Sequence, residues 1–281
     1  MMNSKFDVDF KNRSFFKEVS GKIKAVVPLI QEGETLYSPG FPDDREIIKE
    51  VKRVAKANKI RHIKVDSDIK SFLSTSGYTC IVDLKRISPT KGHKSAINKA
   101  KKYLACRISS GDEAEIEAFR RYYLDVARKE TRPRYTFELL GEWIKQGFGL
   151  LLEARFEGVT AGYVYVLYWG NRAYYFMSAS PEKYRPYNTT HFLQSKAFEI
   201  LRERGVIHYE LGEQFYDSLH YQPTQKECSI SKFKRGFGGT IVVKPSCEYF
   251  LDQQYMIDVY ADRIYKYWER ENENIVLFPK A

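Results

Sequence analysis

After an irregular opening stretch, the chain has apolar residues at helical spacing between residues 42 and 59. Ile47, Val51 and Ala55 fall on one face of this segment, and a proline with two aspartates marks its start. The pattern predicts an amphipathic helix. Two short β-rich runs follow, RHIKVD and YTCIVDL, and then a basic helix is predicted over residues 89–103.

Residues 110–147 carry two further helical patterns. Ser110 and Glu113 have the spacing of a capping box, and the apolar residues that follow predict a helix. A second helix is predicted from Thr136, whose hydroxyl suits an N-cap, to Gly147. Three β-rich runs come next, FGLLLEARF, VTAGYVYVLYW and RAYYFMSAS. Because only the dipeptides EG and GN separate these runs, we expect an antiparallel meander.

A crossover is predicted after the meander. Residues 188–204 form a helical pattern that stops at Gly205, and VIHYEL forms the next strand. About 25 residues with a helix join RAYYFMSAS to VIHYEL, which is the connection that parallel neighbours require. The sheet should therefore change from antiparallel to parallel here. A basic, glycine-rich turn, SKFKRGFGG, then leads to a last β segment and to a tyrosine-rich helix over residues 247–272.

These patterns predict an α/β (α+β) protein in which mixed sheets are flanked by helices. We expect a basic N-terminal lobe over residues 1–108, a second lobe over residues 109–245, and a C-terminal helix and tail over residues 246–281. The chain has 281 residues, of which 43% are hydrophobic. This composition is that of a globular chain and excludes intrinsic disorder.

Positive charge is concentrated in the first part of the chain. Residues 1–110 hold 23 Lys and Arg against 12 Asp and Glu, a net charge of +11, whereas residues 111–281 hold 23 against 24, a net charge of −1. A segment this basic attracts polyanions such as nucleic acid, nucleotide phosphates, lipid pyrophosphates or an anionic membrane face. A solvated helix face kept soluble by lysine is the alternative explanation.

Membrane and metal chemistry find little support in the sequence. No apolar run of about 18 residues occurs, and charges interrupt the N-terminal segment, so we expect a cytoplasmic protein without a transmembrane segment. The four cysteines are far apart and no histidine stands at zinc-ligand spacing, so no metal site is expected. Aromatic residues in the last helix leave peripheral membrane contact open, although core or dimer contacts explain them as well.

The predicted crossover allows a binding slot. Two strands that diverge near Ser178 and Leu211 would expose backbone amide groups, which an extended donor such as a pantetheine arm can pair with like an added strand. Tyr175 and Ser178 would line this slot. The N-terminus of the crossover helix offers N–H groups for phosphates, and the residues there are Asn188, Thr189, Thr190 and His191. Helix capping alone also explains Asn188 or Thr189.

Carboxylates at the end of VIHYEL are candidate general bases, because ligands of open α/β sheets collect at strand ends. A reaction in which an amine attacks needs such a base, since only the neutral amine is nucleophilic. Glu213 is the first choice, and Glu210 is the alternative if it does not serve a buried hydrogen bond instead. His220 and Tyr216 follow in a loop, where they are candidates to relay a proton or to contact the acceptor.

Residues 149–239 resemble the C-terminal half of the FemAB-like branch of the GNAT acyltransferase superfamily. The likeness is carried by the strands AGYVYVLYW and AYYFMSAS, the helix FLQSKAFEILRERG, the strand end HYELGEQ and the segment SKFKRGFGG. Upstream, VDLKRISPTKGHKSAINKAKK and FRRYYLDVARK resemble the region before the second lobe and its first helix. The resemblance thus covers roughly residues 80–240 and implies tandem GNAT-like lobes.

The resemblance also implies an activity and two site residues. It implies acyl transfer to an amine, with acyl-CoA or aminoacyl-tRNA as co-substrate and no tightly bound cofactor. Lys234 matches the family's lysine in F-K-x-x-F-G, which is associated with the acyl-transfer pocket, and Arg235 is expected to contact phosphate or to pack. Two features depart from the pattern: no long helical hairpin is predicted, and PEKYRPYNTTHF contains no glycine for a pyrophosphate loop.

The leading hypothesis is therefore an N-acyltransferase acting on a small-molecule or lipid-linked amine, such as a cell-envelope or polysaccharide precursor. The basic first lobe motivates an anionic acceptor. One alternative is a strictly aminoacyl-tRNA-dependent ligase, with tRNA as a partner. Another is a non-catalytic RNA-binding or adaptor protein on the same scaffold, because a fold does not establish a function.

Overall fold

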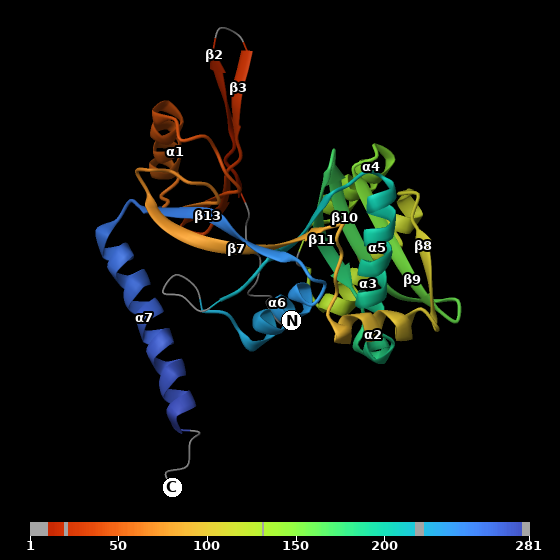
Figure 1. Cartoon of the computed structure of the whole chain (residues 1–281). Helices are drawn as coiled ribbons and strands as arrows, with labels where there is room; N and C mark the ends of the chain where they lie inside the picture. Colours follow the sequence, from red (N-terminus) through yellow and green to blue (C-terminus); the bar gives the residue numbers. More distant parts are fainter. Residues whose placement is uncertain (1–10, 20–21, 131, 217–221, 277–281) are drawn as a thin grey trace, which may run out of the picture. The chain divides into compact units, whose positions relative to one another are not determined.

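A computed structural model of the chain describes residues 11–19, 22–130, 132–216 and 222–276 (Figure 1). The elements are, in chain order, β1 (Lys11–Asn12), β2 (Phe15–Val19), β3 (Lys22–Val27), β4 (Ile30–Glu32), β5 (Thr35–Ser38), α1 (Arg45–Ala57), β6 (His62–Val65), β7 (Leu73–Asp83), α2 (Lys91–Ala100), β8 (Leu104–Ile108), α3 (Glu113–Ala127), α4 (Arg134–Lys145), β9 (Gly149–Phe156), β10 (Val159–Trp169), β11 (Arg172–Ala179), the 3₁₀ helix η1 (Glu182–Tyr187), α5 (Thr189–Glu203), β12 (His208–Glu213), α6 (Gln225–Arg235), β13 (Thr240–Phe250) and α7 (Gln253–Val276).

The described residues divide into two compact units that the chain enters more than once. The first unit holds the residues up to Tyr78, Phe215–Cys228 and those from Val243 onward, and the second holds Thr79–Gln214 and Ser229–Val242. The boundaries therefore differ from those predicted at residues 108 and 245. The reason is strand pairing: the end of β7 pairs with β12 in the second unit, whereas the end of β13 pairs with β6 in the first.

The first unit is a mixed sheet with helices. Its strands follow the order β1, β4, β5, β6 and β13, and only the β5–β6 pair is parallel. Helix α1 forms as predicted and buries Ile47, Val51 and Ala55, while the Asp44 side chain accepts hydrogen bonds from two backbone N–H groups of its first turn. Strands β2 and β3 form a separate hairpin. The sequence interpretation missed these N-terminal strands, which it left as irregular.

Helix α7 is held to the first unit by a buried carboxylate. Glu248 of β13 accepts hydrogen bonds from both terminal nitrogens of Arg263, at 2.9 and 3.0 Å, and lies 3.0 Å from His62 Nε2. Hydrogen bonds from His62 and Arg263 outweigh burial, so the pKa of Glu248 lies well below its usual range. The predicted helix start at residue 247 is wrong, because residues 247–250 pair with β6 as the end of β13.

The second unit is a mixed sheet covered on both faces. Its strands follow the order β7, β12, β11, β10, β9 and β8; β9, β10 and β11 form the predicted antiparallel meander, and β11 and β12 are parallel as predicted. Alternate residues of β9 explain the two cores, since Leu150 and Leu152 pack with α2 and α5 while Leu151 packs with α3 and α4. Figure 1 shows α5 lying along this sheet. Both units thus confirm the α/β class.

Three local predictions are corrected. Helix α3 is capped by Asp112, which accepts from Glu115 N, instead of by Ser110. Helix α4 begins at Arg134, ahead of the proposed cap Thr136. The segment SKFKR is the end of helix α6 and not a turn, because the helix-breaking glycines begin only at Gly236. Among the described residues, no helix combines the length and apolar character that crossing a membrane requires.

Candidate functional site

Strands β11 and β12 separate in the middle of the second unit. Their parallel pairing covers only three residues of each strand and ends at Tyr174 opposite Glu210. Strand β11 continues to Ala179 and β12 to Glu213, and each stays paired on its other side, with β10 and with β7. The predicted divergence is therefore present. The facing edges beyond the last pair are available to hydrogen-bond an extended ligand.

A β-bulge on each strand marks the point of divergence. Opposite β10, strand β11 has one extra residue, Phe176, between Tyr175 and Met177. Opposite β7, strand β12 has one extra residue, Leu211, before Gly212. Bulges bend a strand and redirect its side chains, which is why they recur beside active sites. Here the two bends lead the strands apart.

Gly212 brings two polar side chains together at this point. Its φ of +84° belongs to the left-handed region, and a Cβ placed on it would lie 3.3 Å from Lys234 Nζ and 3.5 Å from Tyr174 Oη. The missing side chain therefore leaves room for both groups. The sequence carried a signal for this residue, because a glycine inside a strand pattern indicates a bulge or a close approach. The sequence interpretation did not use it.

Lys234 comes from the last turn of α6 and is half-buried. Its Nζ donates a hydrogen bond to the backbone oxygen of Glu213 at 3.1 Å. Burial lowers the pKa of Lys234, and the charges of Glu213 and Glu210 oppose this shift. An ammonium group has three N–H donors, and no second partner of Lys234 Nζ is found among the described residues, so two donors can serve a ligand. A cationic donor at a strand divergence can stabilise an oxyanion.

The two candidate bases differ in setting. Glu210 is half-buried, directly follows the last β11–β12 pair, and its Oε1 accepts a hydrogen bond from Thr79 at 2.7 Å. Glu213 is exposed at the end of β12, and it is its backbone oxygen, not its carboxylate, that contacts Lys234. Glu210 is therefore held in a fixed position beside the divergence, which favours it over Glu213 as the proposed base.

The α5 side of the divergence is occupied by a buried polar group. The Tyr175 and Ser178 hydroxyls hydrogen-bond to each other, and Tyr209 donates to Gln194 Oε1 at 3.0 Å. Gln194 is fully buried. Its amide lies close enough to Tyr175 to influence the pKa of that hydroxyl, yet its Nε2 makes no well-aligned hydrogen bond among the described residues. A buried N–H donor without a partner can donate a hydrogen bond to a ligand carbonyl.

The N-terminus of α5 differs from a glycine-rich phosphate loop. Asn188 occupies the cap position with φ of +54° and its side chain makes no capping hydrogen bond, so it is not the side-chain cap that the sequence suggested. The buried Thr189 donates to the backbone oxygen of Tyr184 at 3.3 Å, and Thr190 is half-buried. The 3₁₀ helix η1 fills the preceding segment. These residues stay candidates for phosphate contact through backbone N–H groups.

His191, another candidate at this helix end, belongs to an aromatic cluster. Its ring lies 4.6 Å from that of His93 and 4.9 Å from that of Phe233, both edge to face. His93 Nε2 lies 2.9 Å from the Phe233 backbone oxygen. Burial, with a smaller contribution from His93, lowers the pKa of His191 to about 4. The cluster joins α2, α5 and α6, which gives His191 a packing role that the sequence interpretation missed.

The remaining sequence candidates fall elsewhere. Tyr216 belongs to the first unit, where its ring packs edge to face with Tyr78, whereas Glu213 and Lys234 belong to the second. His220 lies outside the described residues. Arg235 donates to Gln214 Oε1 at 3.2 Å. The structure thus brings Lys234 to the divergence together with Glu210, Tyr175 and Ser178.

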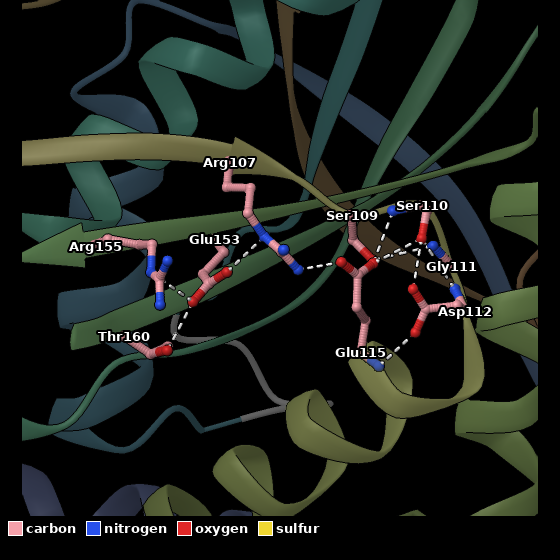
Figure 2. Close-up of polar contacts among 9 residues, drawn as sticks. All are labelled: Arg107, Ser109, Ser110, Gly111, Asp112, Glu115, Glu153, Arg155 and Thr160. Carbon is pink, nitrogen blue, oxygen red and sulfur yellow. Dashed lines mark hydrogen bonds and ion pairs between the residues drawn. The ribbon is translucent and has the colours of Figure 1, made fainter. Parts of the chain in front are cut away.

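A second polar network lies at the edge of the same sheet and holds α3 in place (Figure 2). The buried Glu153 of β9 accepts from Arg107 at 3.0 Å and from Thr160 at 2.7 Å. Glu115 accepts from the Ser109 hydroxyl at 2.6 Å and from Ser110 N at 2.8 Å. Burial would raise the pKa of Glu115, but these hydrogen bonds lower it overall. Each residue drawn makes at least one hydrogen bond or ion pair within the group, which is typical of a network with a structural role.

The basic charge of the first unit gathers along α1. A concavity of about 820 Å³ beside this helix is lined by six cationic residues and one carboxylate. Lys52 stands over the Tyr249 ring at 3.7 Å, and Arg53 pairs with Glu50. Among the described residues, Lys49 and Lys56 have no ion pair. This α1 basin has the charge that the sequence predicted for a polyanion site.

Comparison with known proteins gives a family match for part of the chain. Residues 91–222 match the family model of the acetyltransferase (GNAT) domain, a range that includes β11, α5 and β12. No protein of curated function matches the chain in sequence.

Solved structures show which proteins share the fold. L-PGS from Bacillus licheniformis superposes with a TM-score of 0.65 at 13% identity, covering 90% of this chain and 88% of that one. FemX gives 0.62 at 14% identity, with 89% and 90% covered. The C-terminal domain of a provisionally assigned lysylphosphatidylglycerol synthetase from Agrobacterium fabrum gives 0.62 at 12% identity, with 89% and 86% covered. Residues 91–222 are therefore similar to a GNAT domain, and the chain shares its fold with FemX, with L-PGS and with the Agrobacterium fabrum domain, in line with the predicted resemblance.

Proposed function

We propose that this protein is an acyltransferase that moves an acyl or aminoacyl group onto a primary amine at the β11–β12 divergence. The observation that carries the proposal is the end of strand pairing at Tyr174 and Glu210, with Lys234 beside Gly212. The GNAT family match supports the reaction class. One of the structural neighbours is named as a synthetase of lysylphosphatidylglycerol, which agrees with aminoacyl transfer onto an envelope component.

The proposed reaction needs three groups of this chain. The divergent strand edges and the Gln194 amide hold the donor in an extended form, so that its carbonyl points to Lys234. Glu210 takes one proton from the acceptor ammonium, and the neutral nitrogen attacks the carbonyl carbon. Lys234 stabilises the oxyanion of the tetrahedral intermediate. The nitrogen of the tetrahedral intermediate then loses its second proton to solvent, the C–S or C–O bond breaks, and the departing thiolate or alkoxide receives the proton from Glu210.

Two donor classes fit this scheme. Acyl-CoA is the usual co-substrate of GNAT domains. Aminoacyl-tRNA is favoured by a specific observation, since the α1 basin offers cations for a phosphodiester backbone and the segment before α5 contains no glycine loop for a pyrophosphate. We propose both as donors to be compared, with a cytoplasmic reaction on a small or lipid-linked amine.

The test is a transfer assay with radiolabelled acetyl-CoA and with aminoacyl-tRNA, each supplied with a panel of primary amines. We expect one donor to give an amide product, and Lys234→Ala to lower kcat/KM by roughly 10²-fold or more because the oxyanion loses its cation. Lys232→Ala is the matched control, since Lys232 is exposed on the same helix.

The same assay identifies the base. We expect Glu210→Gln to lower kcat and to remove the acidic limb of its pH profile, whereas Glu213→Gln changes both little. Failure of both donors with every amine, or full activity of Lys234→Ala, would argue for an adaptor on this scaffold instead of an enzyme.

A further inference from the structure

A second concavity of the second unit opens on the α4 side of the sheet, at the same pair where β11 and β12 part. It has a volume of about 380 Å³. Its aromatic walls come from three elements and from the residue before β9, and they are Trp143, Phe148, Tyr168, Trp169 and Tyr174. Glu210 also lines it. We call this concavity the aromatic basin.

The walls of the aromatic basin are unusually exposed for their size. The Trp169 side chain is 71% exposed and that of Tyr174 is 40% exposed. The Trp169 ring packs on Phe148 at 4.6 Å, so it is held in place while one face stays open. Large aromatic surfaces that are fixed but uncovered are typical of sites that bind an apolar or cationic group.

Glu210 places a carboxylate in the aromatic basin, and one of its two oxygens is open to a ligand. Glu210 Oε1 accepts from Thr79, and among the described residues no partner is found for Oε2. A carboxylate held by one hydrogen bond in a concavity lined by aromatic rings can bind an ammonium group, because the ammonium group then makes a charge-assisted hydrogen bond and contacts ring faces together.

The basin also contains one cation, which sets the direction of the ligand. Arg172 lines the basin at the start of β11, two residues before Tyr174 along the strand. Arg172 pairs in register with His208 and Tyr174 with Glu210, so the arginine lies at the first paired position of the two strands and the carboxylate at the last, beside the divergence. An amine would therefore lie with its nitrogen toward the divergence.

These features place an amine where the proposed chemistry needs it. Glu210 belongs to the last β11–β12 pair, and Gly212, two residues later, adjoins Lys234 and Tyr174. A nitrogen bound to Glu210 thus stands at the entrance of the gap that holds the donor. The basin and the gap meet at one carboxylate.

We infer that the aromatic basin is the acceptor site and that it selects primary amines with an apolar body, aromatic or aliphatic, over polyanionic acceptors. The role of the aromatic basin as an acceptor site rests on the proposed acyl transfer, whereas the binding of an amine there does not. It replaces the anionic acceptor expected from charge alone, because the charged residues that line the aromatic basin are Arg172 and Glu210, whose charges are opposite, and the other lining residues are uncharged.

Binding of 4-phenylbutylamine to the full chain tests the inference without any donor. Titration calorimetry at neutral pH should show saturable binding that is at least roughly tenfold tighter than that of the neutral isostere 4-phenylbutanol. Glu210→Gln should remove this preference. Trp169→Ala should weaken the amine roughly fivefold, whereas Trp268→Ala in α7 should not. Thermal denaturation confirms that each variant is folded.

Arg172→Gln supplies the decisive comparison within the basin. An amine held on Glu210 should bind this variant as tightly as the wild type or tighter, because a like charge has been removed. Weaker amine binding to Arg172→Gln, equal affinity for the amine and the alcohol, or an unchanged affinity in Glu210→Gln overturns the inference.

The transfer assay separates this inference from the proposed function. If the amine binds as expected and no donor acylates it, the acceptor site stands and the transferase proposal fails. If polar amines such as ethanolamine are acylated with a KM that Trp169→Ala leaves unchanged, the transferase stands and the acceptor site fails.

Discussion

Gly212 is the residue on which the site geometry depends most directly. A side chain there would meet Lys234 Nζ, and its φ of +84° strains any L-residue by about 1–2 kcal/mol. We therefore expect Gly212→Ala to lower kcat/KM roughly tenfold or more by displacing the Lys234 amine, since small misplacements of catalytic groups cost large factors in rate. Transfer kinetics and thermal denaturation measured together check this.

Gly205 provides the matched control for that substitution. Its φ is +81°, nearly the same strain, but nothing lies within 4 Å of the position of its missing Cβ. Gly205→Ala should therefore lose similar stability and keep its activity. If the two variants lose activity in equal measure, the loss comes from strain, and Lys234 is not positioned by the open side of Gly212.

At the scale of elements, the contact among α2, α5 and α6 gives a pH-dependent prediction. The pKa of His191 is lowered to about 4 in the folded state, against an ordinary value of 6.5. Between these two values the unfolded chain binds more protons, so stability is fully present above pH 6.5 and is lost as the pH falls toward 4. We expect His191→Phe to keep the ring packing and to reduce this loss in thermal melts recorded from pH 7 to pH 4.

Two other histidines, His208 and His93, provide comparisons for that experiment. His208 is exposed on β12, so His208→Gln should leave the acid loss unchanged. His93 is lowered in pKa mainly by its own burial and should account for part of the loss that remains in His191→Phe. A pH profile of His191→Phe identical to that of the wild type would contradict a neutral, buried His191.

Elements with local signals were the ones that the sequence predicted well. The meander and the α5 crossover follow from tight dipeptide turns and from the length of a parallel connection, and both are present. Helix α6 was missed because the glycines of SKFKRGFGG masked a helix that ends just before them. The site itself was predicted only in part, since the alignment of Lys234 with Gly212 depends on two bulges that no periodicity reveals.

At the scale of the whole molecule, the unit boundaries were out of reach of the sequence. Strands β7 and β13 each contribute residues to both units, so no single linker marks a change of domain. The excess of positive charge in residues 1–110, in contrast, could be predicted, because net charge is a sum over residues and does not depend on the fold. The cations of residues 1–110 gather in part in the α1 basin, which makes the choice of donor a question of ionic strength.

Aminoacyl-tRNA and acyl-CoA are distinguished by how their binding responds to salt. If the α1 basin holds an RNA backbone, log Kd for tRNA should vary linearly with log salt concentration, with a slope of roughly 0.7–0.9 per phosphate contacted. A concave row of cations favours RNA over a flat membrane, because the apolar face of α1 is buried in the core and cannot insert into lipid. We expect the double variant Lys49→Gln/Lys56→Gln to reduce the slope by roughly 2.

The matched control removes the same number of positive charges, but from the second unit, which does not contain the α1 basin. Lys129→Gln/Lys145→Gln changes two exposed lysines of the second unit, so the total charge falls equally while the α1 basin keeps its cations. Anisotropy titrations of labelled tRNA at several salt concentrations give the three slopes. If both double variants lower the slope alike, the attraction is a property of net charge alone. If tRNA binds without a salt slope, or not at all, acyl-CoA is left as the donor that the GNAT fold supports.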